Sequence, residues 1–499
     1  MATDTLKTIG DEICGKEFLN FAPTSNSTKP PHIANGLFRA CTGEICRTQD
    51  VHEWVGKKDA MPLAGKEDAI PSEKIIEDYK EILERGNLEK SNNIKDFRYL
   101  LNELFNQDNS TYPSYEFSVM TISSHWMVKG RVSSEANIGD FLFEILSKKI
   151  EGQRSPAIKL LQEALSNDTD DLTKLVKPII AFRSEREKRT LTEVEYPEDS
   201  DIQWDACKNT IRNGYDRLTA NMRLIGEDRN SLLVLRRFVN YSVFATLLYL
   251  MNADFAVYGG NRTPIVVDAG GELESIKKAS EQSYTVGKKA VEDYFVNAIL
   301  KIIGSQIHGQ PVGACKAWID GMAFSTIAQE ETIKPAIKSY FESFCEEGDV
   351  PKLALARALQ IALYTFEYKN NSPSDFCRVL GVRSGLVGPK GNRAKIKRYL
   401  VNSFTLETIT LSTLSESDLQ DGIELKGLSE KLLSEYYMVI GGDSEHEYLV
   451  LEKTNIAQST PGDLRGDLSL NAQKLANMYI SLGLGKRYAD GVTLIGWRL

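Results

Sequence analysis

Apolar residues recur at helical spacing along most of this chain, so the sequence predicts a mainly α-helical protein with a minor β component. The segment SEKIIEDYKEILERG, residues 72–86, is typical. Its isoleucine, tyrosine and leucine side chains fall on one helical face, Ser72 stands where an N-cap is expected, and Gly86 ends the pattern.

The most apolar run, residues 238–258, decides between a core helix and a membrane helix. A membrane span needs about 20 predominantly apolar residues. This run is close to that length but contains Asn240, Asn252 and Asp254. We interpret it as a buried core helix followed by a strand, with a membrane span as the alternative. Because we interpret residues 238–258 as a core helix, we expect no membrane partner. The first residues carry acids and no apolar core, so we expect no secretory signal.

The chain has 499 residues, which is longer than the usual domain with a single hydrophobic core, so we expect several domains. Proline content, charge and periodicity suggest five ranges. These are an irregular N-terminal region (1–72), a helical domain (73–190), a helical core domain with a short strand near 265–267 (204–345), a helix-turn-helix-like unit (350–410) and a winged-helix-like unit (411–499).

A basic island interrupts an otherwise acidic protein of net charge −9. Residues 378–398 carry seven cations and no acid, and a basic island on an acidic chain is typical of a phosphate-bearing partner. The alternative is a solvated surface whose cations pair with acids elsewhere. The candidate nucleic-acid-binding residues here are Arg378, Arg383, Lys390, Arg393, Lys395, Lys397 and Arg398.

The order of elements around the island resembles a helix-turn-helix unit. Helices are expected near 351–368 and 374–381, followed by a basic third helix over 393–404. That third helix occupies the position of a recognition helix, and Arg393, Lys397 and Arg398 would line one of its faces. Reversing their charges is expected to weaken binding most.

The C-terminal end resembles the last helix and wing of winged-helix domains. A helix is expected over 470–482, followed by a hairpin that turns at residues 489–491. Lys486 and Arg487 stand on the first hairpin strand and complete the candidate nucleic-acid-binding set. Such units bind either DNA or other proteins, and the acidic segment before this one counts against a simple DNA clamp.

Catalytic and cofactor motifs are scarce. The short run Ile265-Val266-Val267 ends at Asp268, and with Glu272, Glu274 and Lys277 it has the residue types of a metal-dependent nuclease. The acid–residue–lysine spacing is missing, and a helix is expected to follow, so we favour a plain strand–turn–helix connection. No Walker sequence or GxGxxG is present, so no nucleotide cofactor is expected.

The cysteines and histidines offer one metal constellation. Cys14, His32, Cys41, Cys46 and His52 lie close together in sequence, but without a CxxC pair. We therefore favour free thiols over a metal site. Seven cysteines, an odd number, suit reduced thiols in a cytoplasmic protein.

Three functional hypotheses follow. The first is a non-enzymatic component or scaffold that docks the phosphate backbone of DNA or RNA through the basic island. The second is a protein–protein adaptor subunit of a multi-protein assembly, such as a prokaryotic DNA-restriction or defence system. The third and least favoured is a metal-dependent nuclease with its carboxylates near Asp268. Nucleic acid and other protein subunits are the expected partners.

Overall fold

The structure is a computed structural model that describes residues 4–24, 26–42, 77, 133–166, 194–304, 306–308, 311–369, 371–390, 396–460, 462–489 and 491–498. Most of the predicted helical domain 73–190 lies outside these residues. Arg393, Lys395, Cys46 and His52 also lie outside them.

The described chain is mostly helical, which confirms the predicted fold class. Its helices are α1 (Thr5–Ile13), α2 (Pro30–Thr42), α8 (Ile138–Ser147), α9 (Pro156–Ser166), α11 (Ala206–Ile225), α12 (Ser231–Tyr258), α13 (Glu274–Gly304), α14 (Val312–Asp320), α15 (Ile327–Glu346), α16 (Pro351–Ala362), α17 (Pro373–Ser384), α18 (Ser403–Thr413), α19 (Glu416–Asp421), α20 (Leu425–Tyr436), α21 (Ser444–Lys453) and α22 (Leu464–Ser481). The strands are β1 (Ile265–Val266), β2 (Val387–Gly388), β3 (Arg398–Tyr399), β4 (Ile423–Glu424), β5 (Met438–Val439), β6 (Gly485–Arg487) and β7 (Thr493–Ile495).

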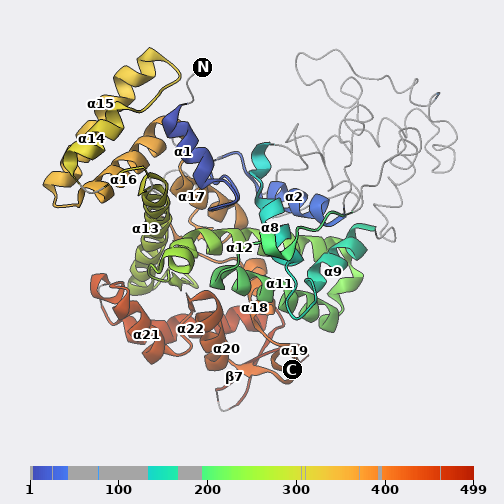
Figure 1. Ribbon diagram of the computed structural model, residues 1–499. Helices are drawn as coiled ribbons and strands as arrows, with labels where there is room; N and C mark the ends of the chain where they lie inside the picture. The colour runs from blue at the N-terminus through green and yellow to red at the C-terminus, as the bar shows by residue number, and fades with distance from the viewer. Residues whose placement is uncertain are drawn as a thin grey trace.

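Helix α12 lies at the centre of the molecule (Figure 1). The Asn230 side chain caps its start by accepting the Leu233 N–H, and Gly259 ends it in the left-handed conformation at φ 74°. Between these ends nearly every residue from Val234 to Asp254 is buried, because α2, α11, α13 and α17 pack around it. The prediction of a buried core helix is confirmed.

By length and composition α12 alone among the described helices could cross a membrane, yet 83% of its most apolar window is buried inside the protein. The strand predicted after it is also present. β1 pairs in parallel with β5 from the C-terminal part of the chain, so Ile265 lies opposite Met438.

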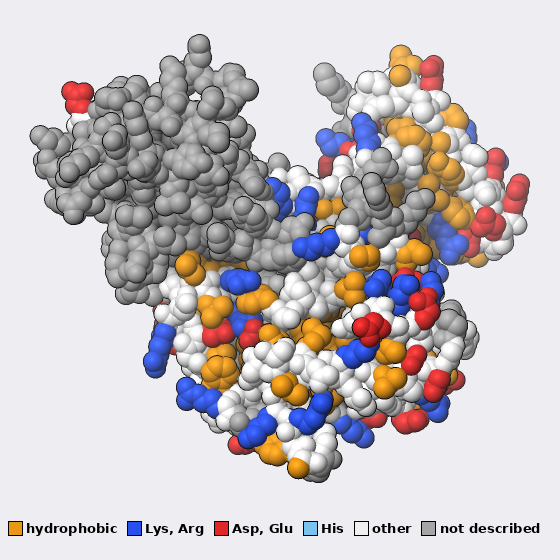
Figure 2. Space-filling view, turned by 180° about the vertical axis from the view of Figure 1, so that it is seen from behind, with side chains coloured by type: hydrophobic (Ala, Val, Ile, Leu, Met, Phe, Trp, Pro, Cys, Tyr) orange, Lys and Arg blue, Asp and Glu red, His pale blue; other side chains and the backbone are white. Residues whose placement is uncertain are grey.

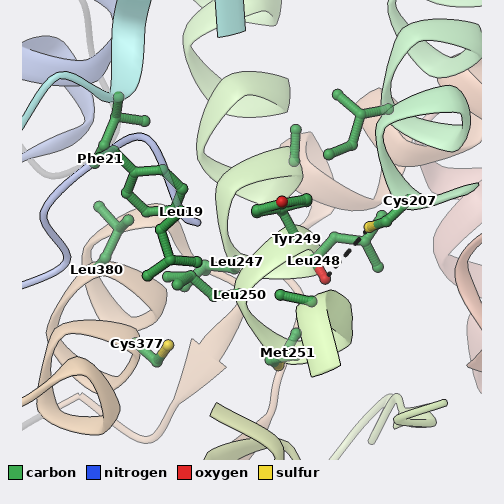
Figure 3. Close-up of a cluster of buried hydrophobic side chains, with 14 of the residues drawn as sticks. Leu19, Phe21, Cys207, Leu247, Leu248, Tyr249, Leu250, Met251, Cys377 and Leu380 are labelled. Atoms are coloured by element: carbon green, nitrogen blue, oxygen red, sulfur yellow. Dashed lines mark hydrogen bonds between the residues drawn. The ribbon is translucent and has the colours of Figure 1, made fainter. Parts of the chain in front are cut away.

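One hydrophobic cluster extends through the molecule. It includes Leu6, Phe141, Phe244, Leu380 and Ile495, which come in turn from the five ranges suggested by the sequence. Figure 3 shows how the N-terminal segment joins this cluster, with Leu19 and Phe21 beside Tyr249 of α12 and Leu380 of α17.

Three helices form an arm at one edge of the molecule (Figure 1). α14 and α15 pack on each other and on α16, whose last turn continues into a π-helical segment, Leu363–Glu367. The first turn of α16 holds Pro351, where a missing N–H costs nothing.

The C-terminal part ends in a three-stranded antiparallel sheet of order β4-β7-β6. α22 ends before Gly483, which adopts φ 74°, and the chain then forms the hairpin of β6 and β7. The predicted helix and hairpin are confirmed. The third strand, β4, joins β7 from between α19 and α20 and was not predicted.

The prediction of a basic helix over residues 393–404 is wrong. Arg398 and Tyr399 form β3, which pairs antiparallel with β2, and α18 begins only at Ser403. Tyr399 explains the difference, because its side chain is only 1% exposed and its N–H donates to Ser280 Oγ of α13 at 2.9 Å. The core therefore holds this segment extended, and Lys397 and Arg398 share no helical face.

Candidate nucleic-acid interface

Arg398 faces into the protein. Its Nε donates to Asp268 Oδ2 at 2.7 Å, and the two side chains are 13% and 2% exposed. The same carboxylate accepts the N–H groups of Gly270 and Gly271, at 3.1 and 2.6 Å from Oδ1. Arg398 is thus the ionic partner of a buried carboxylate two residues after strand β1.

Two other cations of the island also contact backbone inside the fold. Lys397 is 6% exposed and its Nζ donates to the Pro389 carbonyl at 2.6 Å. Burial, together with the charge of Arg378, lowers the pKa of Lys397. Arg383 Nη1 donates to the carbonyl oxygens of Asn26 and Thr28 at 2.8 and 2.6 Å, which ties α17 to the segment before α2.

The remaining described cations of the island are more exposed. Arg378 has a 37% exposed side chain and pairs with Asp375 at 3.1 Å, one turn earlier in α17. Lys390 is exposed. The cations that are clustered in the sequence therefore do not form one surface patch. Arg383, Lys397 and Arg398 instead donate hydrogen bonds to groups of the protein itself.

The carboxylates near Asp268 do not converge. Asp268 contacts Arg398, whereas Glu272 pairs with Lys474 of α22 at 2.5 Å and Glu274 pairs with Lys277 at 3.2 Å. Each acid therefore has a cation of its own, and the residues after the glycine turn form α13, as expected of a strand–turn–helix connection.

The described members of the cysteine–histidine constellation have separate environments. Burial raises the pKa of Cys14 to about 12 and also raises that of Cys41. His32 Nδ1 accepts the Lys29 N–H at 3.0 Å. Within the part of the chain that the structure describes, no three His, Cys, Asp or Glu side chains are placed to hold a metal ion.

Lys486 and Arg487 lie on the exposed strand β6, as the sequence suggested. Lys486 Nζ lies 5.2 Å from the ring centre of Tyr488, near the hairpin turn. Arg487 Nη2 donates to Asn477 Oδ1 of α22 at 3.0 Å, and its Nε donates to Thr493 Oγ1 at 3.4 Å. These contacts orient the Arg487 guanidinium along the junction of hairpin and helix.

An open groove of about 450 Å³ lies between the hairpin, α22 and the start of α20. Two cations, Lys426 and Arg487, and one acid, Glu424, line it. Gln473 and Asn477, four residues apart on the exposed face of α22, contribute amides. A search for charged residues misses these amides, because only their i, i+4 spacing on an amphipathic helix marks them.

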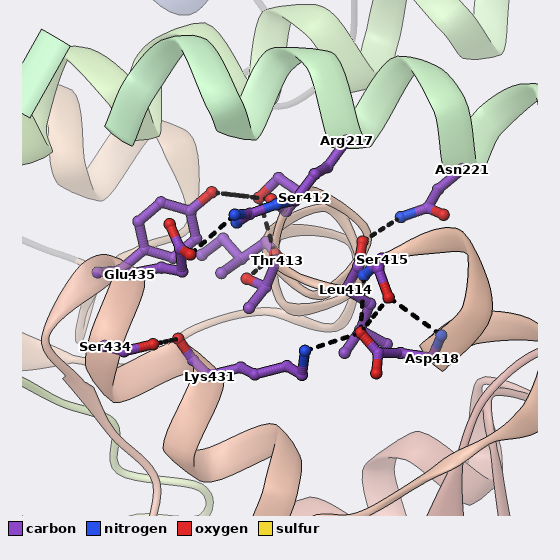
Figure 4. Close-up of polar contacts among 12 residues, drawn as sticks. Arg217, Asn221, Ser412, Thr413, Leu414, Ser415, Asp418, Lys431, Ser434 and Glu435 are labelled. Atoms are coloured by element: carbon purple, nitrogen blue, oxygen red, sulfur yellow. Dashed lines mark hydrogen bonds and ion pairs between the residues drawn. The ribbon is translucent and has the colours of Figure 1, made fainter. Parts of the chain in front are cut away.

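The space-filling view shows Lys and Arg side chains spread over the lower part of the molecule, where Figure 1 places the C-terminal elements (Figure 2). Polar contacts anchor these elements to the body (Figure 4). Arg217 of α11 pairs with Glu435 at 2.8 Å, and Asn221 donates to the carbonyls of Leu411 and Leu414 at 2.7 and 2.8 Å. These contacts therefore fix α20, whose start lines the groove, to α11.

The fold and this groove define a mainly α-helical protein with a helix-and-hairpin surface at one end. The chain matches no protein-family model, no curated protein and no solved structure.

Proposed function

We propose that this chain is a nucleic-acid-binding component, without catalytic activity of its own, that contacts the phosphate backbone through its C-terminal helix and hairpin. The observation that carries the proposal is the exposed strand β6, where Lys486 and Arg487 follow α22 directly. A helix followed by a basic hairpin is the arrangement with which winged-helix proteins approach a duplex. The strand order β4-β7-β6, with β4 between two helices, supports the same resemblance.

The contact surface of this proposal differs from the one expected in the basic island. Arg398, Lys397 and Arg383 bind protein groups, so neutralising phosphates with them would break those interactions. Lys486 and Arg487 are exposed. Lys426, which lines the groove together with Arg487, pairs with Asp443 at 3.5 Å and keeps a 60% exposed side chain. A phosphate backbone would meet these three cations without any rearrangement of the core.

The cysteines support a cytoplasmic setting for such a component. The six described cysteines are free thiols, and four of them, Cys41, Cys207, Cys315 and Cys377, are buried. A reducing compartment keeps thiols in this state.

A second candidate, an adaptor that holds another protein, is favoured by the helical arm. Val312, Val350 and Ile327 are 44, 51 and 75% exposed. Apolar side chains are visible along this arm in Figure 2. Exposed apolar patches mark protein-binding surfaces more often than nucleic-acid-binding ones. The two activities are compatible, because the arm and the hairpin belong to different elements.

The experiment that tests the proposal is a fluorescence-anisotropy titration of the full chain. The probes are a labelled DNA duplex, a single strand of the same length and an RNA duplex, each with and without magnesium. If two or three phosphates are neutralised, raising salt from about 50 to about 200 mM should weaken binding roughly ten- to fortyfold. Absence of binding at the lower salt would overturn the proposal, and magnesium-dependent cleavage would overturn its non-catalytic part.

A further inference from the structure

We infer that the exposed face of α22 reads adenine–thymine base pairs in the major groove of a DNA duplex, an inference that rests on the function proposed above. The residues concerned are Gln473 and Asn477, with Leu470 one turn before them. Leu470 is 46% exposed, a large value for a leucine on a helix that packs against the core. Positions 470, 473 and 477 share one helical face, so the three side chains point the same way.

The chemistry of this face matches one base pair better than the other. Asparagine and glutamine amides can donate to adenine N7 and accept from its N6 amino group at once, and an apolar side chain can contact the thymine methyl. Guanine is read mainly by arginine or lysine. Gln473, Asn477 and Leu470 therefore provide the set expected for adenine–thymine pairs.

The two cations of α22 are directed elsewhere. Arg465 pairs with Glu445 at 3.3 Å and lies 4.2 Å over the ring of Tyr448. Lys474 pairs with Glu272 at 2.5 Å. The amide face is thus left without a guanine-reading cation from its own helix.

Arg487 can position Asn477. Its Nη2 donates to Asn477 Oδ1 at 3.0 Å, and the second lone pair of that oxygen remains able to accept the adenine N6 amino group. Gln473 has no hydrogen bond to the described residues, so its amide is available to a ligand. Lys426 and Arg487 line the same groove as the two amides, so cations that can contact the backbone are part of the same surface.

The experiment compares an adenine–thymine-rich DNA duplex with the same duplex in which 7-deazaadenine replaces adenine. This replacement removes the N7 acceptor from the major groove and leaves the phosphates and the minor groove in place. The inference expects the full chain to bind the 7-deaza duplex about fivefold or more weakly, as expected when one bidentate hydrogen-bond pair is broken. The Gln473→Ala variant should bind the unmodified duplex more weakly and discriminate less between the two.

The control variant is Gln420→Ala, which removes an exposed glutamine of α19 that does not line the groove. It should keep the discrimination of the unaltered chain. Equal, salt-sensitive binding of both duplexes would overturn the base-reading inference and leave the proposed function standing. Lack of binding to either duplex would overturn both, and the same loss of discrimination in Gln420→Ala would overturn the assignment to Gln473.

Discussion

The Nε atom of Arg398 donates to Oδ2 of Asp268 at 2.7 Å, across 130 positions of sequence. The sequence suggested a nucleic-acid contact for one residue and a carboxylate site for the other. In the structure they neutralise each other between β1 and β3, where Asp268 N–H also donates to the Tyr399 carbonyl at 2.9 Å. This pair holds the segment just after β1 against β3.

Removing the arginine should therefore destabilise the fold. Arg398→Ala leaves the Asp268 carboxylate buried without its cation, and we expect the free energy of unfolding to fall by about 3 kcal/mol. Urea unfolding followed by circular dichroism measures this loss. The matched control is Arg378→Ala, which breaks a half-exposed pair within α17 and should cost under about 1 kcal/mol. Equal losses in the two variants would contradict a structural role for Arg398.

The segment around Arg398 shows which structure local sequence patterns cannot predict. The hairpin of β6 and β7 and the strand near Ile265 follow from local patterns, and both are present. The extended conformation of Tyr399 depends on Ser280, 119 positions away, and on Val387 in the paired strand. Helical spacing in a short segment carries no information about such distant partners.

Only part of the candidate site could be predicted from the sequence, because the sequence does not reveal the distant partners of a cation. Lys486 and Arg487 are exposed on β6, which is an edge strand of the three-stranded sheet. Arg383 and Lys397 looked similar in sequence, but each has backbone carbonyls as partners. Charge density along a sequence does not tell whether a cation faces solvent or an internal acceptor.

The crossing of α2 and α8 requires a glycine at position 139. A Cβ atom there would collide with the backbone of Gly36 and Leu37, which cannot move aside as a flexible side chain can. Gly139→Ala should lower the free energy of unfolding by about 3 kcal/mol. Gly313→Ala in α14 is the control, because no atom lies within 4 Å of its added Cβ. That variant should gain roughly 0.5 to 1 kcal/mol, and equal thermal stability of the two would contradict the close approach.

Asp418 gives a prediction about pH. It forms a capping box with Ser415 at the start of α19, and Lys431 Nζ lies 2.9 Å from its Oδ2 (Figure 4). Burial opposes ionisation, but the hydrogen bonds from Ser415 and Lys431 outweigh it and hold the pKa of Asp418 below its ordinary value. A lowered pKa means that the unfolded chain takes up the proton first as the pH falls.

The stability contributed by Asp418 should therefore be present at neutral pH and disappear in acid. Asp418→Asn is expected to cost about 1 kcal/mol between roughly pH 5 and pH 8. The difference between the two proteins should shrink below about pH 4, as the unaltered carboxyl is protonated. Urea unfolding of both proteins across this range measures it. A difference that widens on acidification would show that the pKa is raised instead.

The last prediction concerns the hairpin. It distinguishes direct contacts of Lys486 and Arg487 with phosphates from an effect of the protein's net charge. Reversing both charges, Lys486→Glu with Arg487→Glu, should weaken binding to a DNA duplex and lower the slope of log affinity against log salt by about 2, one for each phosphate that is no longer neutralised. The control reverses Lys149, just after α8, and Lys159 in α9, which are exposed cations, and changes the net charge equally. If both double variants bind equally weakly, the effect comes from overall charge. If only the hairpin variant binds more weakly and keeps its unfolding midpoint, Lys486 and Arg487 contact the phosphate backbone.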